Sequence, residues 1–250
     1  MSFESKTIII TGASSGIGLA TARAFKKKGA DILMVARSKS RLAQIAKEIG
    51  SRFLAIDVTE DGAAEKIVGE AVMASGKIDV LVNSAGIIRT GNIMNTPIQE
   101  FDYMMDINLR SVFLLMQTAL PFLKESKGNI VNVSSVTGVR AFPNILSYCV
   151  SKAGLDHLTR CSALELAEYG VRVNAVNPGV VVTSLHRAGG MQEKQYEEFL
   201  EHSKTTHPLG RVGTPDEIAE LIVFLASDKA MWITGETVSI DGGRFLTCFR

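Results

Sequence analysis

The sequence has 250 residues, 46% of them hydrophobic and 21% charged, and its 27 Lys and Arg residues nearly balance 26 Asp and Glu residues. This balance argues against a nucleic-acid partner, and no apolar run approaches the ~18 residues of a membrane-spanning helix, so no membrane partner is expected. Because no basic and apolar leader opens the chain and Cys149, Cys161 and Cys248 lack zinc-site or disulfide spacing, we expect a cytoplasmic protein with three reduced thiols and no metal.

The chain opens with the pattern of a strand, a glycine-rich turn and a helix. Residues 6–10 are apolar and largely β-branched, the turn Thr11-Gly-Ala-Ser-Ser-Gly-Ile-Gly18 follows, and a helical pattern runs to about Lys28. Such a turn brings the backbone close to a ligand, and the helix start presents free N–H groups to a pyrophosphate. An isolated glycine-rich loop is as often a plain turn, but the strand and helix around this one favour a dinucleotide site. The residues predicted to bind are Gly12, Ser14, Ser15, Gly16, Ile17 and Gly18.

The predicted second strand, residues 31–36, determines the choice of dinucleotide. Arg37 and Ser38 follow it, where a site for NAD usually carries an acid that accepts the ribose hydroxyls. A guanidinium suits the 2′-phosphate of NADP instead, so we expect NADP(H) rather than NAD(H). Since Lys39 and Arg41 are close by, a solvated basic turn is the alternative.

The third and fourth predicted strands, residues 52–56 and 78–82, end in small and polar residues. A short acid and an apolar residue after the third strand are suited to bracket an adenine ring, although the acid has an equal chance of capping the next helix. The small-residue turn after the fourth strand allows close packing against a ribose. The residues predicted to contact the cofactor here are Asp57, Val58, Asn83, Ala85 and Gly86.

Three side chains around the predicted fifth strand, residues 129–134, suggest the chemistry. Ser135 follows this strand directly, and Tyr148 and Lys152 are four residues apart, on one face of the next helix. The lysine ammonium is expected to lower the tyrosine pKa from about 10 towards the operating pH. Ser135 would then hold a carbonyl oxygen beside the phenol, as a ketone reductase or an alcohol dehydrogenase requires.

Asn108 is a polar residue within a mostly apolar helix. The residue pattern alone favours a helix kink or a satisfied core amide, and the alternative is a water on a proton path to Lys152. Farther along the chain, the predicted sixth strand, residues 171–176, stops at Asn177-Pro-Gly179, and Val181 and Thr183 are placed to meet a nicotinamide carboxamide.

The remaining segments complete an α/β pattern. Residues 184–210 are polar, with a helical pattern over 192–203, and are expected to form a lid over the substrate. Thr214 begins a further helix and residues 237–240 form a seventh strand. Alternating strands and helices predict a doubly wound, mainly parallel sheet, the Rossmann fold, in one domain over residues 1–250.

Along its whole length the chain resembles the short-chain dehydrogenase/reductase family, in particular its 3-oxoacyl-acyl-carrier-protein-reductase-like members. The motifs that carry the resemblance are the Thr11–Gly18 loop, Asn83-Ser-Ala-Gly86, Ser135 and the Tyr148-x3-Lys152 pair. Ser84 departs from the second asparagine of the family's Asn-Asn-Ala-Gly turn.

The resemblance implies roles for further residues. Asn108 would be a fourth catalytic position, at a helix kink whose freed carbonyl holds a water linked to Lys152, and Pro178, Gly179 and Thr183 would bind the nicotinamide. Lys152 would also hydrogen-bond the nicotinamide ribose. Family members mostly form tetramers or dimers, here through the helices over 108–124 and 147–169.

Together these features predict an NADP(H)-dependent carbonyl reductase that acts on a small molecule, with Tyr148 as general acid or base. A catalytically silent nucleotide-binding regulator is the alternative. The family does not fix the substrate. The residues expected to line the substrate pocket, besides the lid, are Ile88, Arg89, Val136, Arg140, Phe142 and Leu146.

Overall fold

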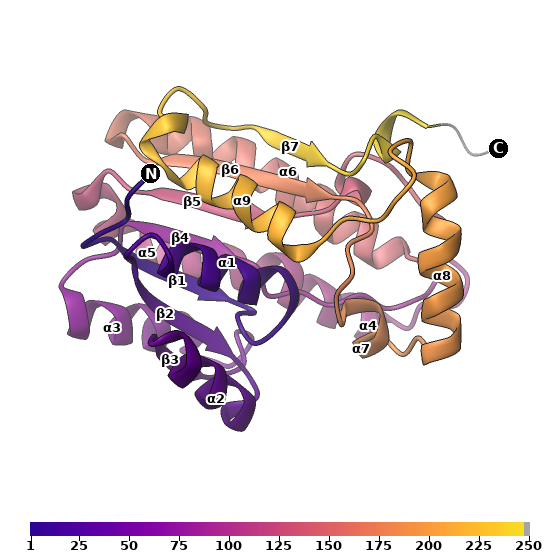
Figure 1. Cartoon of the computed structure of the whole chain (residues 1–250), viewed down its shortest axis with the longest axis horizontal. Helices are drawn as coiled ribbons and strands as arrows, with labels where there is room; N and C mark the ends of the chain where they lie inside the picture. Colours follow the sequence, from indigo (N-terminus) through magenta and orange to yellow (C-terminus); the bar gives the residue numbers. More distant parts are fainter. Residues whose placement is uncertain (248–250) are drawn as a thin grey trace.

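Seven parallel strands form one sheet in the computed structural model, which describes residues 1–247 (Figure 1). The strand order is β3-β2-β1-β4-β5-β6-β7, which confirms the predicted doubly wound fold. The strands are β1 (Thr7–Thr11), β2 (Asp31–Ala36), β3 (Arg52–Ala55), β4 (Val80–Asn83), β5 (Asn129–Val133), β6 (Arg172–Pro178) and β7 (Thr237–Ile240).

The central strands are apolar because helices cover both faces of the sheet. All five residues of β1 are buried, and Ile8 pairs in register with Ile32 of β2 and Val80 of β4. Successive side chains of a strand point to opposite faces. Ile8 therefore packs in one hydrophobic cluster and Ile9 in the other.

Helices α1, α2 and α9 contribute to the cluster around Ile8, and α3, α5 and α6 to the cluster around Ile9. The helices are α1 (Gly16–Lys26), α2 (Lys39–Ile49), α3 (Ala63–Ser75), α4 (Ile98–Met105), α5 (Ser111–Ser126), α6 (Leu146–Leu166), α7 (Leu185–Ala188), α8 (Glu193–Thr206) and α9 (Pro215–Ala226). Within residues 1–247, none of these helices combines the length and apolar character needed to cross a membrane.

Apart from small shifts at the ends of several elements, two features differ from the sequence prediction. Strand β6 does not stop at Asn177: it extends through Pro178, which pairs with Ile240 of β7. A proline is tolerated there because it is the last residue of the strand, and Gly179 supplies the next N–H, which donates to the Ile240 carbonyl at 3.2 Å. The lid also contains the short helix α7, which the sequence pattern does not reveal.

Helix α9 begins as its sequence predicts. Thr214 is the N-cap, Pro215 occupies the first turn, and the Glu217 carboxylate accepts a hydrogen bond from the Thr214 N–H at 2.8 Å. Cys149 and Cys161 are free thiols, while Cys248 lies outside the described residues.

Candidate active site

The carboxyl ends of the strands open onto a cavity of about 980 Å³. In Figure 1 the arrowheads of β6 and β7 point towards the side of the molecule where α8 lies. Of the residues predicted from the sequence to bind the cofactor or catalyse, all line this cavity except Asn83 and Asn108. The topology therefore gathers residues from positions 12 to 183 into one site.

The glycine-rich turn after β1 packs directly against the turn after β4. Thr11 Oγ1 accepts hydrogen bonds from the N–H groups of Ser84 and Ala85, each at 3.0 Å. Gly12 has φ +66°, and a Cβ there would lie 2.8 Å from the Ser84 carbonyl oxygen. The small-residue turn is therefore intact although position 84 is a serine, where the family motif has an asparagine.

The start of α1 fits a phosphate group. Ser15 is the N-cap and makes no side-chain capping bond, and no acidic residue occurs in the first turn. The first N–H groups of a helix lack intrahelical acceptors and carry a partial positive charge. Since they line the cavity, the residues Ser15 to Gly18 are suited to hold the pyrophosphate of a dinucleotide.

Arg37 lies at the nucleotide end of the cavity, where its side chain is 61% exposed. Its Nη1 is 3.7 Å from the Asp57 carboxylate and 3.4 Å from the Tyr103 hydroxyl. Asp57 does not cap α3, because the N-cap of that helix is Gly62; the carboxylate instead accepts from the Thr59 N–H at 3.0 Å. The Asp57 carboxylate, the one carboxylate among the described residues that line the cavity, is thus already engaged by Thr59 and Arg37.

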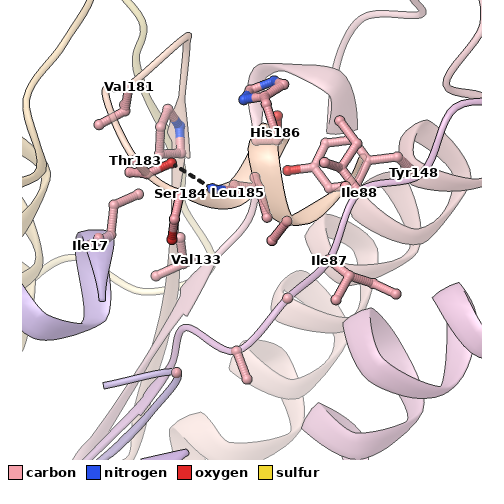
Figure 2. Close-up of a pocket in the computed structure, with 18 of the residues that line it drawn as sticks. Ile17, Ile87, Ile88, Val133, Tyr148, Val181, Thr183, Ser184, Leu185 and His186 are labelled. Carbon is pink, nitrogen blue, oxygen red and sulfur yellow. Dashed lines mark hydrogen bonds between the residues drawn. The ribbon is translucent and has the colours of Figure 1, made fainter. Parts of the chain in front are cut away.

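Ser135, Tyr148 and Lys152 all line the cavity. Ser135 follows β5 and Tyr148 lies in the first turn of α6, where the phenol hydrogen-bonds the Ser135 hydroxyl. Lys152 Nζ lies 5.8 Å from the centre of the Tyr148 ring and donates to the Val133 carbonyl at 2.8 Å. Figure 2 shows the Tyr148 phenol pointing towards the lid segment of Thr183, Ser184 and Leu185.

The expected lowering of the tyrosine pKa is not what the structure shows. Burial raises the pKa of Tyr148 to about 12, and the hydrogen bond with Ser135 offsets this rise only in part. Burial also lowers the pKa of Lys152 to about 8, although the Asp156 carboxylate acts in the opposite direction. The sequence prediction considered the charge of Lys152 but not the loss of water around both groups, and desolvation is the larger effect here.

Asn108 lies beneath the cavity, in a π-helical turn, Asp106–Arg110, between α4 and α5. Its amide pairs with the backbone of Ile87, accepting from the N–H at 2.9 Å and donating to the carbonyl at 3.0 Å, and it also donates to Ser151 Oγ at 3.0 Å. The residue is thus a satisfied core amide at an irregular point of the helix. It ties the loop after β4 to α6, the helix that carries Tyr148 and Lys152.

Asn83 also lies below the cavity wall. Its side chain is buried and donates to Asn132 Oδ1 at 2.9 Å, and Asn132 donates in turn to Thr159 Oγ1 of α6 at 2.9 Å. This chain of hydrogen bonds fixes β4, β5 and α6 relative to one another. Asn83 therefore supports the site from below, whereas Ala85 and Gly86 line the cavity.

The lid begins with residues that contact the nucleotide loop. Ser184 Oγ hydrogen-bonds Ser15 Oγ at 3.3 Å, and a Cβ at Gly16 would lie 3.1 Å from Thr183 Cγ2. His207 anchors the other end of the lid, because its Nε2 accepts from the Val180 N–H at 3.1 Å. In residues 1–247, no group of three or more His, Cys, Asp or Glu side chains is arranged to hold a metal ion.

The structure places four of the six predicted substrate-pocket residues in the cavity wall. These are Ile88, Arg89, Val136 and Phe142. Arg140 and Leu146 do not line the cavity, and Arg140 instead donates to the Arg244 carbonyl at 2.8 Å. Phe199 and His202 of the predicted lid also line the cavity, as expected. Arg244 lines it too, although no local sequence pattern indicates this, because it reaches the cavity through tertiary packing.

A parallel Rossmann-type sheet with an uncapped glycine-rich helix start beside a Ser, Tyr and Lys group is typical of a nucleotide-dependent oxidoreductase. Residues 12–244 match the family model described as enoyl-(acyl carrier protein) reductase. The chain is 39% identical to the 3-oxoacyl-[acyl-carrier-protein] reductase FabG of Thermotoga maritima, over 97% of this chain and 99% of that protein. It is 36% identical to FabG of Staphylococcus aureus, over 96% of this chain and 98% of that protein.

Solved structures agree with these relatives. A Caenorhabditis elegans short-chain dehydrogenase/reductase of unknown function, solved with cofactor, superposes with a TM-score of 0.93 at 37% identity and covers 98% of this chain and 97% of its own. The chain belongs to the short-chain dehydrogenase/reductase family, and within it to the FabG-like members. It is accordingly an oxidoreductase.

Proposed function

We propose that this protein is an NADP(H)-dependent oxidoreductase that interconverts a carbonyl compound and its alcohol. The observation that carries the proposal is the convergence of Ser135, Tyr148 and Lys152 in the cavity that the α1 N-terminus also lines. A bound nicotinamide cofactor would supply the hydride. The residues that would hold it are those of the glycine-rich turn, Arg37 and the segment from Pro178 to Thr183.

Tyr148 would transfer the proton. With a pKa of about 12, its phenol is protonated at neutral pH and is therefore poised as a general acid, which favours carbonyl reduction. Ser135, hydrogen-bonded to this phenol, would hold the substrate oxygen beside it. Lys152, close to the ring, would stabilise the phenolate that forms when the proton leaves.

The preference for NADP(H) rests on Arg37. Strand β2 ends at Ala36, so no carboxylate occupies the position that accepts ribose hydroxyls in NAD sites. The Arg37 guanidinium is exposed at the cavity and is suited to a 2′-phosphate.

We further propose a homodimer or homotetramer in the cytoplasm. Phe113 of α5 and Leu164 of α6 are 46% and 83% exposed, and their apolar surface suits a contact between copies of this chain. Leu155, by contrast, is buried in the core of its own chain.

The test is loss of NADPH absorbance with a panel of carbonyl compounds that includes 3-oxoacyl thioesters, because FabG relatives carry the name of such a reductase. Tyr148→Phe should lower turnover by a factor of roughly 10² to 10⁴, the usual contribution of a general acid, while NADPH still binds. Tyr169→Phe, at a partly exposed phenol on the protein surface, is the matched control and should remain active. Undiminished turnover in Tyr148→Phe would refute the assignment, and NADPH binding without turnover of any compound would favour the silent regulator.

A further inference from the structure

The part of the cavity beyond the nucleotide loop is lined by cations. Arg89, Lys152 and Arg244 all contribute to its wall. Asp57 is the one carboxylate among the described residues that line the cavity, and it lies at the nucleotide end, 3.7 Å from Arg37. A substrate that enters from the lid side therefore meets positive charge and no described carboxylate.

Arg244 is held firmly in this wall. It begins a 3₁₀ turn, Arg244–Leu246, shortly after β7, and its guanidinium donates a hydrogen bond to Thr206 Oγ1 at the end of α8. The guanidinium carbon lies 5.0 Å from the centre of the Phe142 ring, and Phe142 also lines the cavity. These contacts fix the position of the side chain at the junction of lid and cavity.

Among residues 1–247 no ion pair includes Arg244, and the nearby carboxylate that acts on its charge is that of Asp241. Asp241, three residues earlier, uses its carboxylate to accept from the backbone N–H groups of Gly243 and Phe245, at 3.0 and 2.6 Å. Burial, together with the nearby Arg140 guanidinium, lowers the pKa of Arg244, although the Asp241 carboxylate acts in the opposite direction. An anionic ligand would stabilise the charge of such a half-buried guanidinium, which has lost part of its hydration.

The other cations of the wall differ from Arg244. Arg89 Nε lies 3.8 Å from the Glu100 carboxylate, which offsets its charge. Lys152 donates to the Val133 carbonyl and is already assigned to Tyr148. Arg244 is thus the cation of this wall that forms no ion pair with a described residue and has no role in the proposed reaction.

We propose that Arg244 and the C-terminal end of α8 form an anion subsite, which holds a carboxylate or phosphate group of the substrate while the substrate carbonyl lies against Tyr148. His202 lines the cavity one helical turn before Thr206, on the same face of α8, and adds a second donor. Phe142 and Phe199 supply apolar surface for the carbon chain of such a substrate. This inference rests on the proposed reductase function and specifies its substrate class.

The test compares matched pairs of carbonyl compounds with NADPH: oxo acids of increasing chain length against their methyl esters, and a phosphorylated ketone against its dephosphorylated form. The wild type should show the higher kcat/KM for the charged member of a pair, and the class that benefits distinguishes carboxylate from phosphate. Arg244→Gln should lower kcat/KM for that member by roughly ten- to hundredfold, the scale of one charge-assisted contact, and leave the neutral member unchanged. Arg244→Lys should retain part of the preference.

Arg187→Gln is the matched control, because Arg187 belongs to the lid but pairs with Glu193 outside the cavity wall. It should preserve the preference. Equal kcat/KM for charged and neutral compounds in the wild type, or an equal loss for both in Arg244→Gln, would overturn the anion subsite and leave the reductase function intact.

If no carbonyl compound is turned over, the reductase function fails, and the subsite is then judged by binding. Calorimetry with glutarate and with inorganic phosphate on the NADPH-loaded protein should show binding that Arg244→Gln abolishes. Binding that is absent, or equal in both proteins, would overturn the subsite as well.

Discussion

Lys152 is expected to make the native state less stable at neutral pH, so removing it should stabilise the fold while it abolishes catalysis. The lysine is buried, and its Nζ donates to the Val133 carbonyl at 2.8 Å. Methionine has a similar unbranched stem and fills the same space without a charge. We therefore compare the free energy of unfolding of Lys152→Met with that of the wild type, both without nucleotide.

The magnitude follows from the lysine pKa. Its fall from an ordinary 10.5 to about 8 means that the charged form is disfavoured in the native state by about 3 kcal/mol. Removing the charge should therefore stabilise the native state by that amount, but loss of the hydrogen bond to Val133 offsets about 1 to 2 kcal/mol of this stabilisation. Lys152→Met should thus raise the free energy of unfolding at pH 7 by about 1 to 2 kcal/mol.

The gain should depend on pH in a defined direction. Below pH 8 the lysine is protonated in both the folded and unfolded states, so the wild type carries the full destabilisation. Between pH 8 and 10.5 only the unfolded state keeps the proton, and the stability of the wild type rises with pH. The advantage of Lys152→Met should therefore shrink across this window and reverse near its upper end.

Urea unfolding of both proteins at pH 7 and pH 10 is the assay. Lys66→Met, at an exposed lysine of α3, controls for effects of pH on the rest of the protein and should show no such trend. A variant less stable than the wild type at pH 7, or a stability difference that is the same at both pH values, would refute the argument from burial.

Two further substitutions test the nucleotide site. Arg37→Ala should weaken NADPH binding roughly ten- to hundredfold and leave NADH binding unchanged, because it removes a charge-assisted contact of about 1.5 to 3 kcal/mol to the 2′-phosphate. Fluorescence titration measures the affinity for both cofactors. An equal loss of affinity for both would mean that Arg37 has another role. Gly18→Ala should lower both the melting temperature and NADPH affinity, because its Cβ would lie 2.5 Å from the Gly12 carbonyl oxygen. Gly69→Ala, in open space on α3, is the control and should be neutral or stabilising; a Gly18→Ala protein that matches it would contradict the clash.

Features that depend on neighbours in the sequence could be predicted from it. The apolar runs locate β2 and β7 at the residues where the structure has them, Asp31–Ala36 and Thr237–Ile240. The spacing of four places Tyr148 and Lys152 on one face of α6, because a helix completes a turn in 3.6 residues. The glycine-rich turn, framed by a strand and a helix, is likewise a local pattern.

Features that depend on what surrounds a residue could not be predicted in this way. Asn83 belongs to a conspicuous turn, yet its side chain hydrogen-bonds Asn132 on the neighbouring strand and does not line the cavity. Pro178 can end β6 in the sheet because β7 pairs with it there. Neither partner is adjacent in sequence.

Local spacing and residue chemistry were enough to predict the succession of strands, the glycine-rich turn and the grouping of Ser135, Tyr148 and Lys152, but not the short helix α7. The packing of the fold, in contrast, raises the pKa of Tyr148 and lowers that of Lys152 by burial, and it brings Arg244 to the cavity 92 positions beyond Lys152. Both outcomes depend on which elements exclude water from a group. Desolvation depends on tertiary packing, and a local sequence pattern therefore does not predict it.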